Sequence, residues 1–210
     1  MSEAGPVDEI TSEAELIDLI GEPTRRARDK TRPALHDLDR QWLAASPFCL
    51  IGTSDADGRC DVSPKGDPAG QLAYVLDDRT VAIAERPGNR RVDGYRNVVA
   101  NPHVGLIFLI PGRADTLRIN GGARLVRDGD FFDSMIVKGH RPILALVVEV
   151  EEVFHHCAKA FLRSALWQPD TWTDPLPSRP VIAKTLEANE ASLAELTAYY
   201  GPSYAEKLYG

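Results

Sequence analysis

A change of hydrophobic period at about residue 47 constrains the fold of this chain more than any other feature. Before it, Leu35, Leu38 and Trp42 recur at helical spacing, and a Ser-Pro pair then ends the pattern. After it, residues 48–126 form short runs rich in β-forming residues with turn residues between most of them. These runs are FCLIGTS, RCDVSP, QLAYVLD, TVAIAE, HVGLIFLIP and TLRINGGARLV. Such a pattern predicts the hairpins and meanders of a mainly β domain.

Two further segments complete the predicted topology. A helical interlude, Val92–Ala100, precedes the strongly apolar run HVGLIFLIP, and the later run ILALVVEVEEVFHH predicts a last long strand. Six or so strands with one crossover helix fit a small closed barrel better than a βαβ array. In the strand before the last, Gly121 and Gly122 predict a bulge, a sharp bend or the close approach of a ligand.

Helices are predicted at both ends of this barrel. Ser12 and Glu15 stand in capping-box spacing before an apolar stretch, and Gly21 can end that helix. Further helices are expected at 157–167, around 131–135 and at 188–200, with an irregular Pro-rich segment at 167–181. The chain is therefore organised as one domain with an N-terminal helical extension (1–47), a barrel core (48–156) and a C-terminal helical segment (157–210).

Length, charge and cysteine content exclude several classes of protein. The 210 residues carry a net charge of -7, which disfavours binding to nucleic acid. No stretch approaches the roughly 18 apolar residues of a membrane span, and the acidic N-terminus does not resemble a signal peptide, so a cytoplasmic protein is expected. Cys49, Cys60 and Cys157 lie far apart in the sequence, which predicts reduced thiols and no structural zinc site.

Cationic clusters on this acidic chain point to a small anionic ligand. Arg86, Arg90, Arg91 and Arg96 crowd one segment, in which Gly88-Asn89-Arg90-Arg91 opens the predicted helix. A phosphate ester needs cations and backbone donors, and this segment offers both. The alternative is a solvated helix start, but arginines at a helix N-terminus oppose the helix dipole, which favours a ligand.

Other polar residues are candidates for the same site. Strand alternation places Ser63 and Lys65 on one face, where they either meet a ligand or form part of a surface turn. Asn97 and Asn120 have apolar neighbours and need hydrogen-bond partners if buried; Asn120 either binds a ligand or ties down the bulge. Arg118 shares the face of Asn120 and could pair with a carboxylate or a phosphate. The histidines near the end of the last strand are too few on one face for a metal site.

The segments DVSPKGDPAG, ERPGNRRVDGYRNVVANPHVGLIFLIPG and TLRINGGARL, in this order, resemble the FMN-binding family related to pyridoxamine 5'-phosphate oxidase. The resemblance runs from Phe48 to Trp167, and HCAKAFLRSALWQPDTW is similar to the C-terminal segment of one subgroup with unassigned substrates. It implies a six-stranded split β-barrel with flanking helices, bound FMN and a homodimer. The expected cofactor-binding residues are Ser63, Lys65, Arg86, Asn89, Arg90, Arg91, Asn97, Arg118, Asn120, Lys159 and Arg163.

The resemblance implies a flavin-dependent oxidoreductase that acts on a small-molecule substrate or on reduced nicotinamide, with no catalytic side chain assigned. Two alternatives stay open: a non-catalytic FMN-binding or storage protein, and a haem-binding protein on the same barrel. True pyridoxamine 5'-phosphate oxidases end in an Arg-x-His arrangement, whereas this chain ends in LTAYYGPSYAEKLYG, so oxidation of vitamin B6 is not implied. The apolar runs FLIPG and ILALVVEV favour burial against a second copy of the chain.

Overall fold

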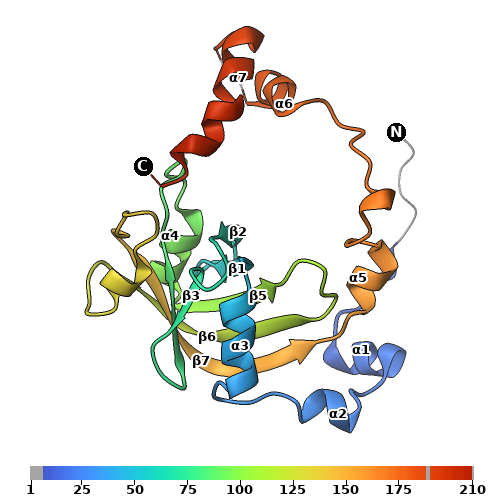
Figure 1. Ribbon diagram of the computed structural model, residues 1–210. Coiled ribbons are helices and arrows are strands. Elements are labelled where there is room, and N and C mark those ends of the chain that lie inside the picture. The colour runs from blue at the N-terminus through green and yellow to red at the C-terminus, as the bar shows by residue number, and fades with distance from the viewer. Residues whose placement is uncertain (1–6, 188–189, 210) are drawn as a thin grey trace. The chain divides into compact units, whose positions relative to one another are not determined.

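The strands of this chain form a seven-stranded antiparallel sheet (Figure 1). The computed structural model describes residues 7–187 and 190–209. The chain divides into two compact units, Met1–Thr31 and Arg32–Gly210, and the whole sheet belongs to the second. Part of the expected acidic N-terminus, residues 1–6, lies outside the described residues.

The first unit contains two short helices. Helix α1 (Glu13–Ile20) begins at the cap Ser12, whose hydroxyl accepts a hydrogen bond from the N–H of Glu15. It ends at Gly21, whose φ of 86° lies in the left-handed region. The predicted helix is confirmed at both ends. A single turn, α2 (Arg25–Arg28), follows it.

The sheet has the strand order β2-β1-β5-β6-β7-β4-β3 and is open. Its strands are β1 (Phe48–Ser54), β2 (Cys60–Gly66), β3 (Ala73–Val75), β4 (Thr80–Ala84), β5 (His103–Leu109), β6 (Thr116–Val126) and β7 (Ala145–His156). The prediction of a closed, six-stranded barrel was therefore wrong in strand number and in closure. Pro64 lies in the edge strand β2 and has no N–H to donate, and the other edge strand, β3, has only three residues. Among the described residues no ladder joins these two edges.

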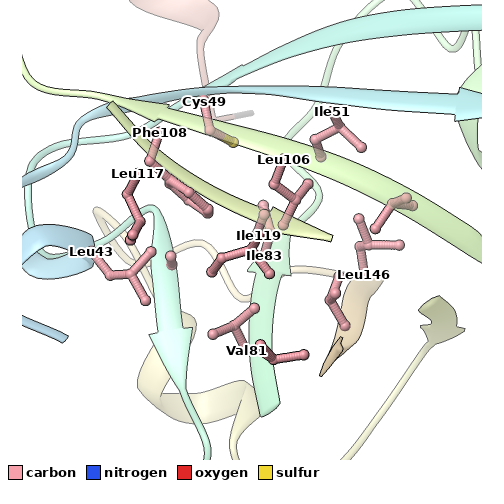
Figure 2. Packing of buried hydrophobic residues seen from close by; sticks show 14 of the residues in the cluster. Leu43, Cys49, Ile51, Val81, Ile83, Leu106, Phe108, Leu117, Ile119 and Leu146 are labelled. Atoms are coloured by element: carbon pink, nitrogen blue, oxygen red, sulfur yellow. The ribbon is translucent and has the colours of Figure 1, made fainter. Parts of the chain in front are cut away.

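Strands β4 and β7 are apolar at consecutive positions because both of their faces are buried. One face contributes to the larger core cluster, in which Figure 2 shows Val81, Ile83 and Leu146. The other face forms a smaller cluster that consists of Ala82, Ala84, Phe132, Met135, Ala145 and Val147. The short helix η1 (Phe132–Met135) supplies two of these side chains. The run ILALVVEV is thus used mostly inside one chain, and so is Phe108 of the run FLIPG. The burial of these two runs against a second copy of the chain stays a prediction, for which Ile143 and the residues after Phe108 are not buried in the single chain.

Helices α3 (Asp37–Ala45) and α4 (Asp93–Ala100) also pack directly on the sheet. Helix α3 lies against β3 and buries Trp42 and Leu43. Helix α4 is the predicted crossover helix, and it lies against β1, β2 and β6. Both helices bury apolar residues against the sheet, as expected for amphipathic helices, but α3 also buries one charged residue, Asp39.

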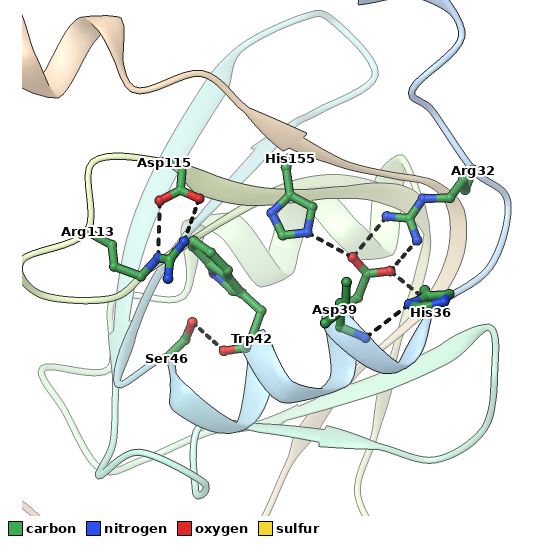
Figure 3. A network of polar contacts seen from close by, with 9 residues as sticks. Arg32, His36, Asp39, Trp42, Ser46, Arg113, Asp115 and His155 are labelled. Carbon is green, nitrogen blue, oxygen red and sulfur yellow. Dashed lines mark hydrogen bonds and ion pairs between the residues drawn. The ribbon is translucent and has the colours of Figure 1, made fainter.

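A buried carboxylate ties α3 to the last strand (Figure 3). Asp39 is fully buried and accepts hydrogen bonds from both terminal nitrogens of Arg32, at 2.5 and 2.9 Å. His155 Nε2 of β7 lies 3.1 Å from the same carboxylate, and the backbone N–H of His36 donates to it over 2.8 Å. Burial raises the pKa of Asp39, but these hydrogen bonds and the Arg32 charge outweigh burial and lower it.

The predicted bulge is present between β6 and β7. The register of the two strands shifts between Asn120 and Gly121. A Cβ atom at Gly121 would lie 1.9 Å from the backbone oxygen of Glu149, so this position tolerates only glycine. The close approach is therefore that of a neighbouring strand, not of a ligand. Asn120 Nδ2 donates to Glu152 Oε2 over 2.8 Å beside the bulge, as one of the two predicted roles requires.

The C-terminal segment departs from the predicted helices in its boundaries. Its elements are α5 (Lys159–Ser164), η2 (Pro169–Thr171), α6 (Arg179–Leu186), α7 (Leu193–Tyr199) and η3 (Pro202–Lys207). Helix α5 is shorter than expected because Ala165 adopts a left-handed φ of 50°. Helix α6 was not predicted; it has a proline in its first turn, which a helix start accepts. The predicted helix at 188–200 begins at Leu193, and residues 188–189 lie outside the described residues.

None of the helices within residues 7–187 and 190–209 combines the length and the apolar character that crossing a membrane requires.

Candidate functional site

A cleft of about 370 Å³ opens beside the edge strand β2. Its walls are β2, the end of β4 and the loop that connects β4 to α4, and we call it the strand cleft. It contains five of the predicted cofactor-binding residues: Ser63, Lys65, Arg86, Asn89 and Arg91. Strand alternation explains the first two, because Ser63 and Lys65 face the cleft while Val62 on the other face lines a different, open hollow.

The inner wall of the strand cleft holds a compact polar group. Lys65 forms an ion pair with Glu85, and the Tyr95 hydroxyl of α4 donates to the same carboxylate. The Lys65 ammonium also lies 4.8 Å from the centre of the Tyr95 ring. Burial, followed by the bond to Glu85, raises the pKa of Tyr95. Tyr95 therefore stays protonated and acts as a donor at neutral pH.

A second ion pair lies where β2 and β4 end. Arg86 Nε donates to Asp67 Oδ2 over 2.7 Å, and Arg86 Nη1 donates to the backbone oxygen of Met135 over 3.0 Å. The Asp67 side chain is 2% exposed. Arg86 Nη2 is buried, and no hydrogen-bond acceptor for it occurs in the part of the chain that the structure describes. The Tyr209 hydroxyl reaches the other oxygen of Asp67 over 2.8 Å.

The loop between β4 and α4 has an unusual backbone. Asn89 Oδ1 accepts a hydrogen bond from the Arg91 N–H over 2.9 Å, and Arg90 between them has a left-handed φ of 62°. A residue other than glycine seldom adopts this conformation, and such positions concentrate at functional sites. Arg91 Nε donates to Asp93 over 2.5 Å while 76% of the Arg91 side chain stays exposed. Helix α4 then begins without a side-chain cap.

Carboxylates balance the cations of the strand cleft. The charged residues that line it are Lys65, Arg86, Arg91, Asp61, Asp67, Glu85 and Asp93. Each of the three cations is paired with one of these carboxylates, and Asp61 accepts a hydrogen bond from Ser63 over 2.9 Å. The interior of the cleft therefore carries no excess of positive charge. Arg91 lies at its exposed end, and Arg90, which precedes it in the same loop, is not among the residues that line the cleft.

Asn97 and Arg118, two other predicted site residues, lie outside the strand cleft. Asn97 Nδ2 donates to Thr53 Oγ1 over 3.1 Å and so ties α4 to β1. Arg118 lies over the ring of Phe154 at 5.1 Å, and its Nε is buried without a hydrogen-bond partner among the described residues. Asn120 lines the open hollow on the other face, together with Val62.

The cations Lys159 and Arg163 on α5 also stand apart from the strand cleft within one chain. Both are exposed and, being four residues apart on a helix, share one face as expected. Their expected contact with the cofactor stays a prediction.

Sequence reasoning missed four residues of the site: Asp67, Glu85, Tyr95 and Tyr209. Glu85 and Asp67 each stood next to a predicted site residue or turn, but an acidic residue there gave no reason to expect a buried ion pair. Tyr95 occupies the inward face of the predicted crossover helix, and this helical periodicity could have identified Tyr95 as a residue near the site. Nothing local in the sequence connects Tyr209 to Asp67.

Thiols and histidines are dispersed. Cys49 is buried, and burial raises the pKa of its thiol to about 12. Cys60 and Cys157 are exposed. Within the described ranges, no group of three or more metal-binding side chains comes together, and no histidine lines the strand cleft.

Comparisons with known structures find proteins of similar fold at low sequence identity. HupZ from Group A Streptococcus is 19% identical, with 58% of this chain and 93% of that chain covered and a TM-score of 0.46. A Lactobacillus delbrueckii protein, provisionally assigned as a pyridoxamine 5'-phosphate oxidase, is 23% identical, with 59% and 95% covered and a TM-score of 0.46. HutZ from Vibrio cholerae, described as a haem storage protein, is 16% identical, with 58% and 93% covered and a TM-score of 0.41.

A family model identifies the chain by its sequence. No curated protein matches it. The model described as pyridoxamine 5'-phosphate oxidase, however, matches residues 35–157. This range includes every strand of the sheet, helices α3 and α4, and the segments of the strand cleft on β2, β4 and the following loop. The chain belongs to the pyridoxamine 5'-phosphate oxidase family.

Proposed function

We propose that this protein binds FMN in the strand cleft and works as a flavin-dependent oxidoreductase. The observation that carries the proposal is the convergence of Ser63, Lys65, Arg86, Asn89 and Arg91, from one strand and one loop, on a single cleft. Its volume of about 370 Å³ lies in the range of small-molecule sites. Membership of the family supports a ligand at this place, and the donor set supports a ligand that carries a phosphate.

The exposed end of the cleft suits the phosphate. Arg91 uses Nε for Asp93, so its terminal nitrogens remain available to a ligand, and Arg90 stands beside it. The first N–H groups of α4 have no side-chain cap, and uncapped helix N-termini favour anions. The left-handed conformation of Arg90 costs about 1 kcal/mol, which a ligand contact would offset.

The inner part of the cleft suits an uncharged ring system. Leu72 and Ala84 contribute apolar surface there, and Ser63 and Lys65 contribute donors from β2. The Lys65–Glu85 pair and the Tyr95 hydroxyl hold one another in place, so these donors are pre-oriented. Bound FMN would carry the electrons, and the chain's own residues would orient it and limit access of water.

The reaction would involve a small-molecule substrate or reduced nicotinamide as partner. Turnover with reduced nicotinamide separates this enzyme from a non-catalytic FMN-binding or storage protein. The haem alternative has less support, because among the described residues no histidine lines the strand cleft. His103 lines the open hollow on the other face of β2, where its side chain is 61% exposed.

A homodimer is part of the proposal. The hollow beside β1, β2 and β5 combines exposed Val62 with Gly52 and Gly105, which allow close approach of another backbone. Val99 on α4, 78% exposed, adds apolar surface elsewhere in the same unit. Apolar surface of this kind on a soluble domain favours a second copy of the chain.

Titration of the FMN-free protein tests the binding proposal. FMN should bind more tightly than riboflavin, because riboflavin lacks the phosphate. The double variant Arg90→Ala/Arg91→Ala should lose about 100-fold in FMN affinity, or about 3 kcal/mol, and little in riboflavin affinity. Arg59→Ala is the matched control, since Arg59 is also 76% exposed and paired with neighbouring aspartates. Equal affinities for the two flavins, or an unchanged double variant, would exclude the phosphate site.

A further inference from the structure

A second cleft, of about 330 Å³, lies on the other side of the loop that borders the strand cleft. Pro87, Gly88 and Asn89 line both clefts. The opposite wall comes from the C-terminal segment and consists of Tyr199, Ser203, Tyr204 and Leu208. We call it the tyrosine cleft.

The chemistry of the tyrosine cleft differs from that of the strand cleft. No charged side chain occurs among the described residues that line the tyrosine cleft, whereas charged residues form much of the lining of the strand cleft. Its polar groups are the hydroxyls of the tyrosines and Ser203 and the amide of Asn89. A charged ligand would find no ion-pair partner among these residues, so the lining favours uncharged ligands.

The two tyrosines present ring surface to this cleft. The rings of Tyr199 and Tyr204 have their centres 5.5 Å apart and are inclined by 66°. Despite this contact the residues remain 62% and 50% exposed, so aromatic surface is left for another ring. Aromatic rings at such distances favour edge-to-face or offset stacking, which a planar ligand can extend.

Tyr209 anchors the C-terminal wall of the cleft to the body of the domain. Its hydroxyl donates to Asp67, and its ring lies 5.8 Å from the Arg86 guanidinium and 5.2 Å from the Lys138 ammonium. His140 stacks on the same ring with centres 6.4 Å apart. The tyrosine wall is thus attached to the ion pair that borders the strand cleft.

We propose that the tyrosine cleft binds a small, uncharged, planar aromatic molecule by stacking on Tyr204 and Tyr199. Its role as the substrate subsite next to the flavin rests on the proposed function, because only the Pro87–Asn89 loop separates the two clefts. The binding itself depends only on the tyrosine cleft.

Fluorescence titration of the full chain with 2-naphthol tests this site. We expect saturable binding of one molecule per chain, and much weaker binding of 2-naphthalenesulfonate, which has the same rings and a negative charge. Tyr204→Ala and Tyr199→Ala should each weaken 2-naphthol binding about tenfold, whereas the phenylalanine variants should bind like the parent. Trp172→Ala is the control, since Trp172 is an exposed aromatic residue outside the cleft.

A separate FMN titration of the same samples distinguishes the two proposals. If 2-naphthol binds and depends on Tyr204 while FMN does not bind, the tyrosine cleft stands and the flavin proposal fails. If FMN binds but the alanine variants retain the parent affinity for 2-naphthol, the tyrosine cleft is overturned. Absence of saturable 2-naphthol binding, equal binding of the sulfonate, or competitive displacement of 2-naphthol by FMN would also overturn it.

Discussion

The hydroxyl of Tyr209 donates a hydrogen bond to Oδ1 of Asp67 over 2.8 Å, although 142 positions separate the two residues in the sequence. Asp67 simultaneously pairs with Arg86 through its other oxygen. One buried carboxylate therefore joins the C-terminal segment to the wall of the strand cleft. Any change in the packing of this segment should reach the cleft through Arg86.

Tyr209→Phe should release the C-terminal segment without unfolding the domain. The substitution removes one hydrogen bond to a carboxylate, worth about 1.5 kcal/mol, and keeps the ring over Arg86. Hydrogen exchange of peptides covering 199–209 should become about tenfold faster, while peptides of β6 and β7 stay unchanged. Tyr204→Phe, which leaves the anchor intact, should behave like the parent. Unchanged exchange in the Tyr209 variant would contradict the anchoring role.

The same anchor has a defined pH dependence. Burial, and then the bond to Asp67, raise the pKa of Tyr209 above its ordinary value. Its contribution is therefore complete below the ordinary tyrosine pKa of about 10 and is lost only as the pH rises through the raised value. The exchange difference between parent and Tyr209→Phe should consequently be constant from pH 7 to 9, after correction for intrinsic exchange.

Gly121→Ala should destabilise the sheet by about 3 kcal/mol. The added Cβ would meet the Glu149 backbone oxygen at 1.9 Å, and a backbone atom of a central strand cannot move aside as a side chain can. Urea unfolding measures the change. Gly52→Ala is the matched strand control, because its Cβ would meet the nearest atom at 3.6 Å, an ordinary contact. Equal unfolding midpoints for the two variants would show that the backbone at the bulge accommodates the added Cβ atom at little cost in stability.

Asp39→Asn should lower the free energy of unfolding by about 3 kcal/mol at pH 7. It leaves Arg32 and His155 without the buried carboxylate that joins them. Because the pKa of Asp39 is lowered in the folded protein, its contribution is present above the ordinary carboxyl pKa of about 4 and is lost as the pH falls through the lowered value.

The difference between parent and Asp39→Asn should therefore be constant from pH 7 to 5 and shrink below pH 4. Urea unfolding at several pH values measures it. Asp37→Asn is the control, since Asp37 lies on the same helix with an 87% exposed side chain. A difference that grows on acidification would contradict this account.

Two of the three thiols should react quickly with a thiol reagent. Cys60 and Cys157 are exposed, whereas Cys49 is buried and its pKa is raised to about 12, so it stays protonated at pH 8. The native protein should release about two equivalents of chromophore from Ellman's reagent, and a third only in denaturant. The Cys49→Ser variant should release the same fast equivalents, and a smaller fast amplitude in that variant would show that Cys49 is accessible.

Sedimentation at micromolar concentration should show a species of twice 23.0 kDa, as a homodimer requires.

If α5 reaches a cofactor site at the subunit boundary, Lys159→Ala and Arg163→Ala should weaken FMN binding without changing the melting temperature of the FMN-free protein. Both side chains are exposed in the single chain, so their removal costs little stability. A monomer would argue against the dimer, and parent-like FMN binding by both variants would make α5 purely structural.

The sequence by itself determined the local features of this protein. The β-rich runs, the capped helix α1, the crossover helix and the glycine bulge were all predicted, because strand alternation, capping and the need for glycine act over a few residues. The shared face of Ser63 and Lys65 also followed from strand alternation, whereas the grouping of these two residues with Arg86, Asn89 and Arg91 came from the family resemblance.

Only the tertiary structure decided how these parts meet. The open edge between β2 and β3, the pairing of Lys65 with Glu85 and Tyr95, and the bond from Tyr209 to Asp67 join distant parts of the chain. Hydrophobic periodicity reports which face of an element is buried, but not which element covers it. The sequence therefore did not show which carboxylates pair with the cations of the cleft, because an ion pair depends on the distance between the two groups in the folded chain.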